Sequence, residues 1–152
     1  MAALKDNRAV ADQILDMIRF LAQDPLLVAD VAARVGPVVE DPGGLMPIEL
    51  RPILPGVRSA RLARYPDSGL PYALELDLAP DARPTPAALK PMLGDYDQAR
   101  TDRGLPREIL FYPPAEGSRW RVAAIARLEA TGGELENAPI ASIAFRRDPV
   151  TP

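Results

Sequence analysis

Apolar and polar side chains alternate with period two through the last third of the chain. From position 119 to 128 the even positions are all apolar, whereas the odd positions include three arginines. The even set is Trp120, Val122, Ala124, Ala126 and Leu128, and the odd set is Arg119, Arg121, Ala123, Ile125 and Arg127. A second run alternates Ala141, Ile143 and Phe145 with Ile140, Ser142, Ala144 and Arg146. Residues 131–134 supply a glycine-containing turn between the runs, so the sequence predicts a β-hairpin that needs a covering layer.

Other segments also have extended character. Residues 71–78 alternate most clearly, with Tyr72, Leu74, Leu76 and Leu78 between Ala73, Glu75 and Asp77. Residues 57–65 precede them across the turn-forming stretch 66–69, which predicts a second hairpin. Residues 109–112 predict a buried strand that Pro113 ends, and residues 46–54 carry prolines that favour a sheet edge.

Helical spacing governs the first 35 positions and a short middle segment. Apolar residues at three- and four-residue intervals predict a first helix, capped by Asp6 or Asn7: Val10, Ile14, Met17, Ile18 and Leu21. A second helix is predicted with Asp24 as N-cap, Pro25 as first residue and Gly36 as its end. A third, short helix is predicted between Thr85 and Gly94.

These elements predict the fold class α+β. We expect two N-terminal helices and one short middle helix, packed on a largely antiparallel sheet of about five to six strands. Residues 1–152 are predicted to form a single domain, and the sequence contains no recognisable repeat. The order of elements and the acidic composition resemble those of small secretion chaperones of bacterial pathogens, a likeness that rests on element order and carries no motif.

Two residue types are absent, and this changes the expected chemistry. Without cysteine the chain forms no disulfide and has no thiol nucleophile, and without histidine it has no histidine-based triad and no standard zinc site. These absences lower the expectation of an enzyme, and we predict no metal and no cofactor. The N-terminus has no secretory signal pattern and no apolar run approaches the roughly 20 residues of a membrane span. A cytoplasmic protein with no membrane association is therefore expected.

The basic residues are the most suggestive candidates for binding. All but two of the 18 are arginines, and the net charge is −3, which does not favour a nucleic-acid partner. If neighbouring strands bring them together, one sheet face gathers guanidinium groups suited to carboxylates or phosphates. The candidates are Arg58, Arg61, Arg64, Arg119, Arg121 and Arg127. The alternative is that they are scattered, solvent-facing residues in an arginine-rich sequence.

Acidic and phenolic side chains suggest a second kind of site. Glu75 and Asp77 share one face of the 71–78 strand and, with Tyr72 and Tyr112, are candidates for a pocket between sheet and helices. Pairing of the two acids with arginines across the hairpin is the competing interpretation. Three more acids, Asp95, Asp97 and Asp102, fail the calcium-loop spacing and are interpreted as a solvated loop.

The sequence therefore favours a non-catalytic protein-binding module of bacterial type, such as an immunity or antitoxin-like protein or a chaperone-like adaptor. The alternative is a small-ligand-binding protein or enzyme that uses Asp, Glu, Tyr and Arg chemistry. The partner, the ligand and the oligomeric state are left open by the sequence.

Overall fold

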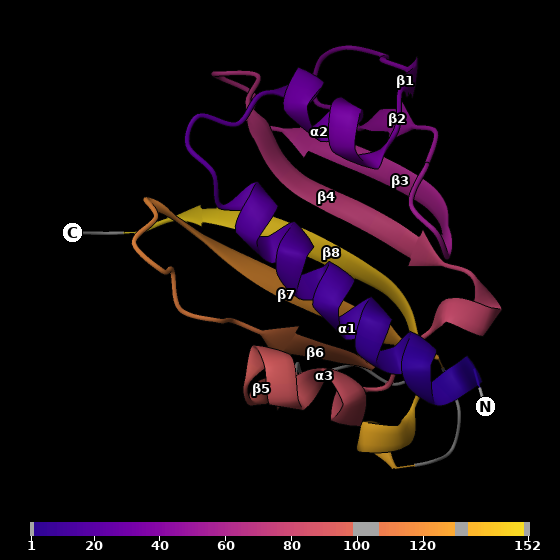
Figure 1. The fold of residues 1–152 in the computed structure, drawn as a ribbon. Helices are drawn as coiled ribbons and strands as arrows, with labels where there is room; N and C mark the ends of the chain where they lie inside the picture. The colour runs from indigo at the N-terminus through magenta and orange to yellow at the C-terminus, as the bar shows by residue number, and fades with distance from the viewer. Residues whose placement is uncertain (1, 99–106, 130–133, 151–152) are drawn as a thin grey trace.

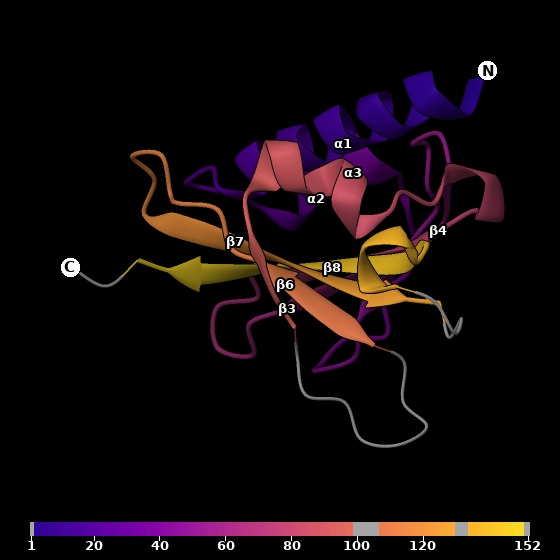
Figure 2. The ribbon, with the colours of Figure 1, turned by 90° about the horizontal axis from the view of Figure 1, so that it is seen from below.

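The computed structural model describes residues 2–98, 107–129 and 134–150. Within them, three α-helices pack on one face of an eight-stranded antiparallel sheet, and the other face is left open (Figures 1 and 2). The predicted α+β class is confirmed, but the expected five to six strands are too few.

The helices are α1 (Ala2–Leu21), α2 (Val28–Val35) and α3 (Pro86–Leu93). The strands are β1 (Val38–Glu40), β2 (Ile48–Leu50), β3 (Val57–Arg64), β4 (Pro71–Leu78), β5 (Tyr96–Gln98), β6 (Glu108–Phe111), β7 (Trp120–Leu128) and β8 (Ile140–Pro149). Two short 3-10 helices, η1 (Pro80–Ala82) and η2 (Leu135–Asn137), follow β4 and precede β8.

The strand order is β1-β2-β3-β4-β8-β7-β6-β5, so each half of the sheet is a four-strand meander. An eight-residue helix precedes each meander, α2 in the first half and α3 in the second. The two halves meet where β4 pairs antiparallel with β8. The structure thus repeats its element order although the sequence shows no repeat.

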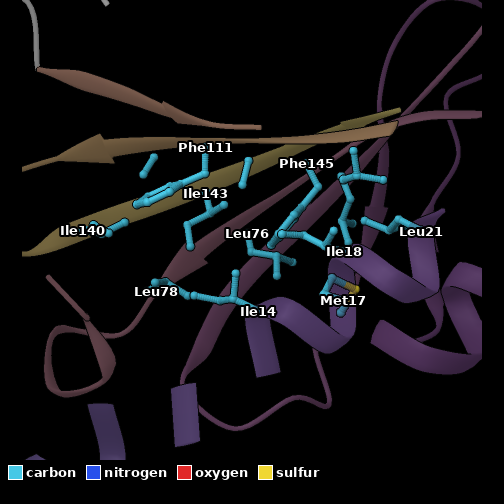
Figure 3. Close-up of a cluster of buried hydrophobic side chains, with 14 of the residues drawn as sticks. Ile14, Met17, Ile18, Leu21, Leu76, Leu78, Phe111, Ile140, Ile143 and Phe145 are labelled. Atoms are coloured by element: carbon cyan, nitrogen blue, oxygen red, sulfur yellow. The ribbon is translucent and has the colours of Figure 1, made fainter. Parts of the chain in front are cut away.

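The core lies between α1 and the helix-covered face of the sheet. Helix α1 runs across this face over β8 and contacts α3 (Figure 1). Four of the five side chains of its predicted apolar stripe are buried, and Val10 is partly buried. Figure 3 shows the buried four, Ile14, Met17, Ile18 and Leu21, pointing at side chains of the strands. The alternation is observed over most of β4 and β7, where the buried side chains include Leu74, Leu76, Leu78, Val122, Ala124, Ala126 and Leu128. It fails at Tyr72, which was expected to face inward and is exposed, and at Ala123, which was expected to face outward and is buried. Trp120 is partly buried.

The two missed strands, β1 and β5, are three residues each and form the two edges of the sheet. Segment 46–54 was expected at an edge, but β2 within it pairs with both β1 and β3. Of the turn predicted at residues 131–134, residues 131–133 lie outside the described residues.

Helix α2 begins three residues later than its cap signal predicts, at Val28 instead of Pro25. Leu27 is the N-cap, and its backbone N–H donates to the Asp30 carboxylate at 2.8 Å. Leu26 is buried at 2% exposure, in the segment where the sequence predicted the first helical turn. Burial of this side chain against the core therefore outweighs the local Asp24–Pro25 signal.

Among the described arginines, one is buried in this core. Arg147 on β8 is 2% exposed, and its guanidinium donates to three carbonyl oxygens: Leu21 (2.7 Å), Gln23 (2.8 Å) and Pro71 (3.3 Å). It also lies 4.1 Å above the ring of Trp120. Because two of the carbonyls are at the end of α1, a cation meets the negative end of the helix dipole there. Arg147 thus fastens the end of the first helix to the last strand.

Candidate functional site

The open face of the sheet is hollowed along one row of its register. Ser59, Asp77 and Ser142 lie side by side on β3, β4 and β8, and Arg127 on β7 continues the row. The first three side chains are short, so the surface dips between longer neighbours. The resulting groove has a volume of about 430 Å³, and Arg58, Arg83 and Arg127 are among its lining residues. We call this the arginine groove.

The three guanidinium groups of the groove differ in the number of hydrogen bonds and ion pairs that they make with described residues. Arg83 donates to the carbonyl of Leu78 at 3.1 Å and pairs with Glu129. Arg127 lies 3.3 Å from Glu108 in an exposed pair. Arg58 makes no hydrogen bond or ion pair with any residue that the structure describes. Its donors are available to an incoming carboxylate or phosphate.

Asp77 is the acidic residue of the groove and is already engaged. Its carboxylate accepts a hydrogen bond of 2.5 Å from the Ser59 hydroxyl. Asp77 therefore supplies a fixed negative charge between the arginines, which favours ligands that place their own negative charge at Arg58 rather than at the centre of the row.

Of the six predicted arginines, the structure brings only Arg58 and Arg127 to this groove. Arg61 pairs with Glu75 directly across β3 and β4, as the competing interpretation of the acids required. Arg64 binds both carboxylate oxygens of Asp41, at 2.8 and 3.2 Å. The hydrogen bond from Arg64 lowers the pKa of Asp41. The third groove arginine, Arg83, was not among the candidates, because it follows η1 and belongs to no alternating run.

The remaining two arginines lie at the opposite end of the sheet. Arg121 stacks 3.6 Å above the Tyr112 ring and donates to the carbonyls of Tyr112 and Pro113. The Tyr112 hydroxyl donates to Asp148 at 3.1 Å, and burial, followed by this bond, raises its pKa. Arg119 is exposed and lies 3.9 Å from Asp24. Arg121 and Tyr112 are thus engaged with each other and with neighbouring acceptors, whereas Arg119 makes only this long ion pair among the described residues.

The alternative candidates do not meet in a pocket between sheet and helices. Tyr72, Glu75, Asp77 and Tyr112 are all missing from the walls of the cavity beneath α1. Asp77 lines the arginine groove instead, and Glu75 pairs with Arg61. Tyr72 is 37% exposed, and its ring meets that of Tyr65 edge-on with 5.0 Å between centroids.

Among the described residues, no three acidic side chains gather where they could hold a metal ion. Asp97 lies on the edge strand β5, Asp95 is 3.7 Å from Lys90, and Asp102 is outside the described residues. No helix in the described part of the chain is both long and apolar enough to cross a bilayer.

Comparison of the chain with known protein families, with curated proteins and with solved structures found no match. The function of this chain is therefore inferred from its own geometry.

Proposed function

We propose that this chain is a non-catalytic protein-binding module that receives an acidic group of another protein in the arginine groove. The observation that carries the proposal is Arg58, an exposed guanidinium without a described partner at the rim of a concave, arginine-lined surface. Asp77 and Ser142 of the groove alternate with buried side chains of β4 and β8, so they project from the sheet face opposite the three helices, all of which lie on one side of the sheet (Figure 2). An immunity or antitoxin-like protein or a chaperone-like adaptor, acting in a bacterial cytoplasm, needs no more than such a surface.

Exposed apolar side chains on the hairpin beside the groove strands support the same proposal. Five of the eight large apolar residues that are exposed in the described chain fall between positions 38 and 53, on or beside β1 and β2. Leu45 is 75% exposed, Met46 63% and Ile53 62%. Clustered apolar exposure of this kind marks protein contact surfaces. Strand β1 is short and irregular in register, which disfavours simple strand addition at this edge and leaves side-chain contact as the mode of binding.

An enzymatic role has less support. The chain has no histidine and no cysteine. Its candidate groups, Tyr72, Glu75, Asp77 and Tyr112, are distributed over separate contacts rather than around one cavity. General acid–base or nucleophilic catalysis requires such groups to converge on a reacting atom.

The proposal is tested with an acidic peptide and with native-host extract. A peptide rich in aspartate and glutamate is expected to shift the backbone amide signals of Ser59, Asp77 and Ser142. Arg58→Glu is expected to abolish those shifts, whereas Arg51→Glu, which reverses an exposed arginine outside the groove, is expected to preserve them. In the extract, a partner retained by the wild type and by Arg51→Glu should be lost with Arg58→Glu and with rising salt. Equal retention by both variants would refute the groove as the binding surface.

A further inference from the structure

A separate cavity lies beneath α1, on the opposite face of the sheet from the arginine groove. It has a volume of about 140 Å³ and is walled by apolar side chains of α1, β4 and β8. Six of them are labelled in Figure 3: Ile14, Met17, Leu76, Leu78, Ile143 and Phe145.

The exposure of the core residues shows that solvent reaches this cavity. Ile14, Met17, Leu76 and Leu78 keep 5–7% exposure, whereas most of the core is at 0–2%. The side chains with residual exposure are therefore concentrated on the walls of the cavity. It is an accessible chamber rather than a sealed packing defect.

The size and the walls of the chamber define what fits inside. An apolar cavity of about 150 Å³ in another protein core stays dry and binds benzene. A chamber of about 140 Å³ with comparable walls has room for a phenyl ring or a branched aliphatic group of the same size. Water gains few hydrogen bonds there, so an apolar body displaces it readily.

The mouth of the chamber carries polar groups. Gln13, Asp16 and Arg34 line it together with the apolar walls. The Arg34 guanidinium lies 5.1 Å from the centre of the Phe20 ring and makes no ion pair with a residue that the structure describes. Asp16, exposed on α1, makes none either. A cation thus stands at the entrance of an apolar chamber, with one opposing carboxylate at the same rim.

We propose that the chamber binds a small carboxylic acid, with a phenyl-sized apolar body beneath α1 and the carboxylate at Arg34. Arginine matches a carboxylate because its planar guanidinium donates two parallel hydrogen bonds. The Asp16 carboxylate repels the ligand carboxylate and therefore weakens binding. This inference does not rest on the proposed protein-binding function, since the two sites lie on opposite faces of the sheet.

The experiment is an NMR titration of the full chain with phenylacetate and, as a neutral body of similar size, toluene. Both are expected at millimolar concentration to shift the methyl signals of Ile14, Leu76 and Leu78. Arg34→Gln is expected to weaken phenylacetate binding by at least about threefold, and Asp16→Asn to strengthen it, while toluene binding stays unchanged in both variants. Arg51→Gln, a matched arginine away from the chamber, should change neither.

Filling the chamber provides the second arm of the test. Ala82→Leu, at the wall formed by η1, is expected to abolish binding of both molecules while the signals of Ile109 and Leu128 stay in place. If that variant does not fold, Leu78→Phe fills the same space from β4. Absence of shifts with either molecule overturns the site. Phenylacetate binding that is indifferent to both Arg34 and Asp16 overturns the assignment of the carboxylate.

Discussion

Replacing Arg147 by methionine isolates the contribution of the buried cation to stability. The substitution keeps an unbranched side chain of similar length but removes every donor to the carbonyls of Leu21, Gln23 and Pro71. Two of these hydrogen bonds are fully buried, those to Leu21 and Pro71. Leaving a buried acceptor without its donor costs about 1–3 kcal/mol, and a desolvated cation–π contact contributes about 2 kcal/mol.

These losses are partly offset, because desolvating the guanidinium also has a cost. Burial lowers the pKa of Arg147, although an arginine stays charged at neutral pH. By analogy with removing one partner of a buried ion pair, we expect Arg147→Met to lower the free energy of unfolding by about 3–5 kcal/mol. For a chain of this size the unfolding temperature should fall by about 6–20 °C.

The neighbouring residue offers a matched control. Arg146 lies on the opposite face of β8, half-buried, with both its Nε and Nη2 bound to the Asp148 carboxylate at 2.9 and 3.0 Å. A partly exposed pair of this kind stabilises by up to about 1 kcal/mol, so Arg146→Met should have a small effect. The free energy of unfolding of both variants is measured by urea unfolding followed by far-ultraviolet circular dichroism. Trp120 fluorescence is unsuitable, because Arg147 lies over the Trp120 ring and its replacement would itself change the signal. If Arg147→Met is no less stable than Arg146→Met, the anchoring role is refuted.

Three further predictions concern a glycine, a tyrosine and an aspartate. A Cβ at Gly36 would lie 1.6 Å from the carbonyl oxygen of Arg51, with φ +153°, so Gly36→Ala should lose about 3 kcal/mol or more in urea unfolding. The pKa of Tyr112 is raised in the folded protein, so the protonated hydroxyl stabilises the fold below pH about 10. This stabilisation is lost as pH rises through the folded-state pKa. Absorbance titration should show Asp148→Asn lowering that pKa. Because the pKa of Asp41 is lowered, this residue stabilises the fold above pH about 4, and the stabilisation is lost as pH falls through the folded-state pKa. In acid unfolding, the free energy of unfolding of Asp41→Asn should therefore depend less on pH over this range than that of the wild type.

The long strands could be predicted from the sequence because each repeats its alternation several times. Strands β4 and β7 have eight and nine residues, enough for the period to be recognised and for the buried face to be assigned. Strands β1 and β5 have three residues each, and no period is visible in so short a segment. Their pairing depends on neighbours distant in sequence, so local residue preferences do not reveal it.

The burial of Arg147 could have been predicted from the alternation in the sequence. Ile143 and Phe145 occupy the buried face of β8, and the next residue in phase is Arg147. An arginine in phase with core residues signals a buried cation that needs acceptors, but the sequence alone does not identify those acceptors. They come from the end of α1, from Gln23 just after it and from the start of β4, separated from Arg147 by up to 126 residues.

The arginine candidates illustrate the same limit at the surface. Alternation correctly separates the arginines of β7 from its apolar side chains, yet it says nothing about ion pairing. Arg64 is bound by Asp41 from the β1–β2 connection, and Arg121 by Tyr112, so neither guanidinium is free. Arg83 lines the groove from the position directly after η1, outside any run whose alternation could have indicated its direction.

The strand synthesised last of the eight occupies the middle of the sheet. While β8 is missing, β1–β4 and β5–β7 are two separate ribbons, and the inner edges of β4 and β7 each expose unpaired backbone donors and acceptors. Helix α1, made first, also lacks the Arg147 contact at its end until β8 arrives. A nascent chain, or one cleaved before β8, thus exposes two unpaired strand edges that can pair with other chains. Protection from aggregation therefore depends on how quickly the ten residues of β8 insert between β4 and β7.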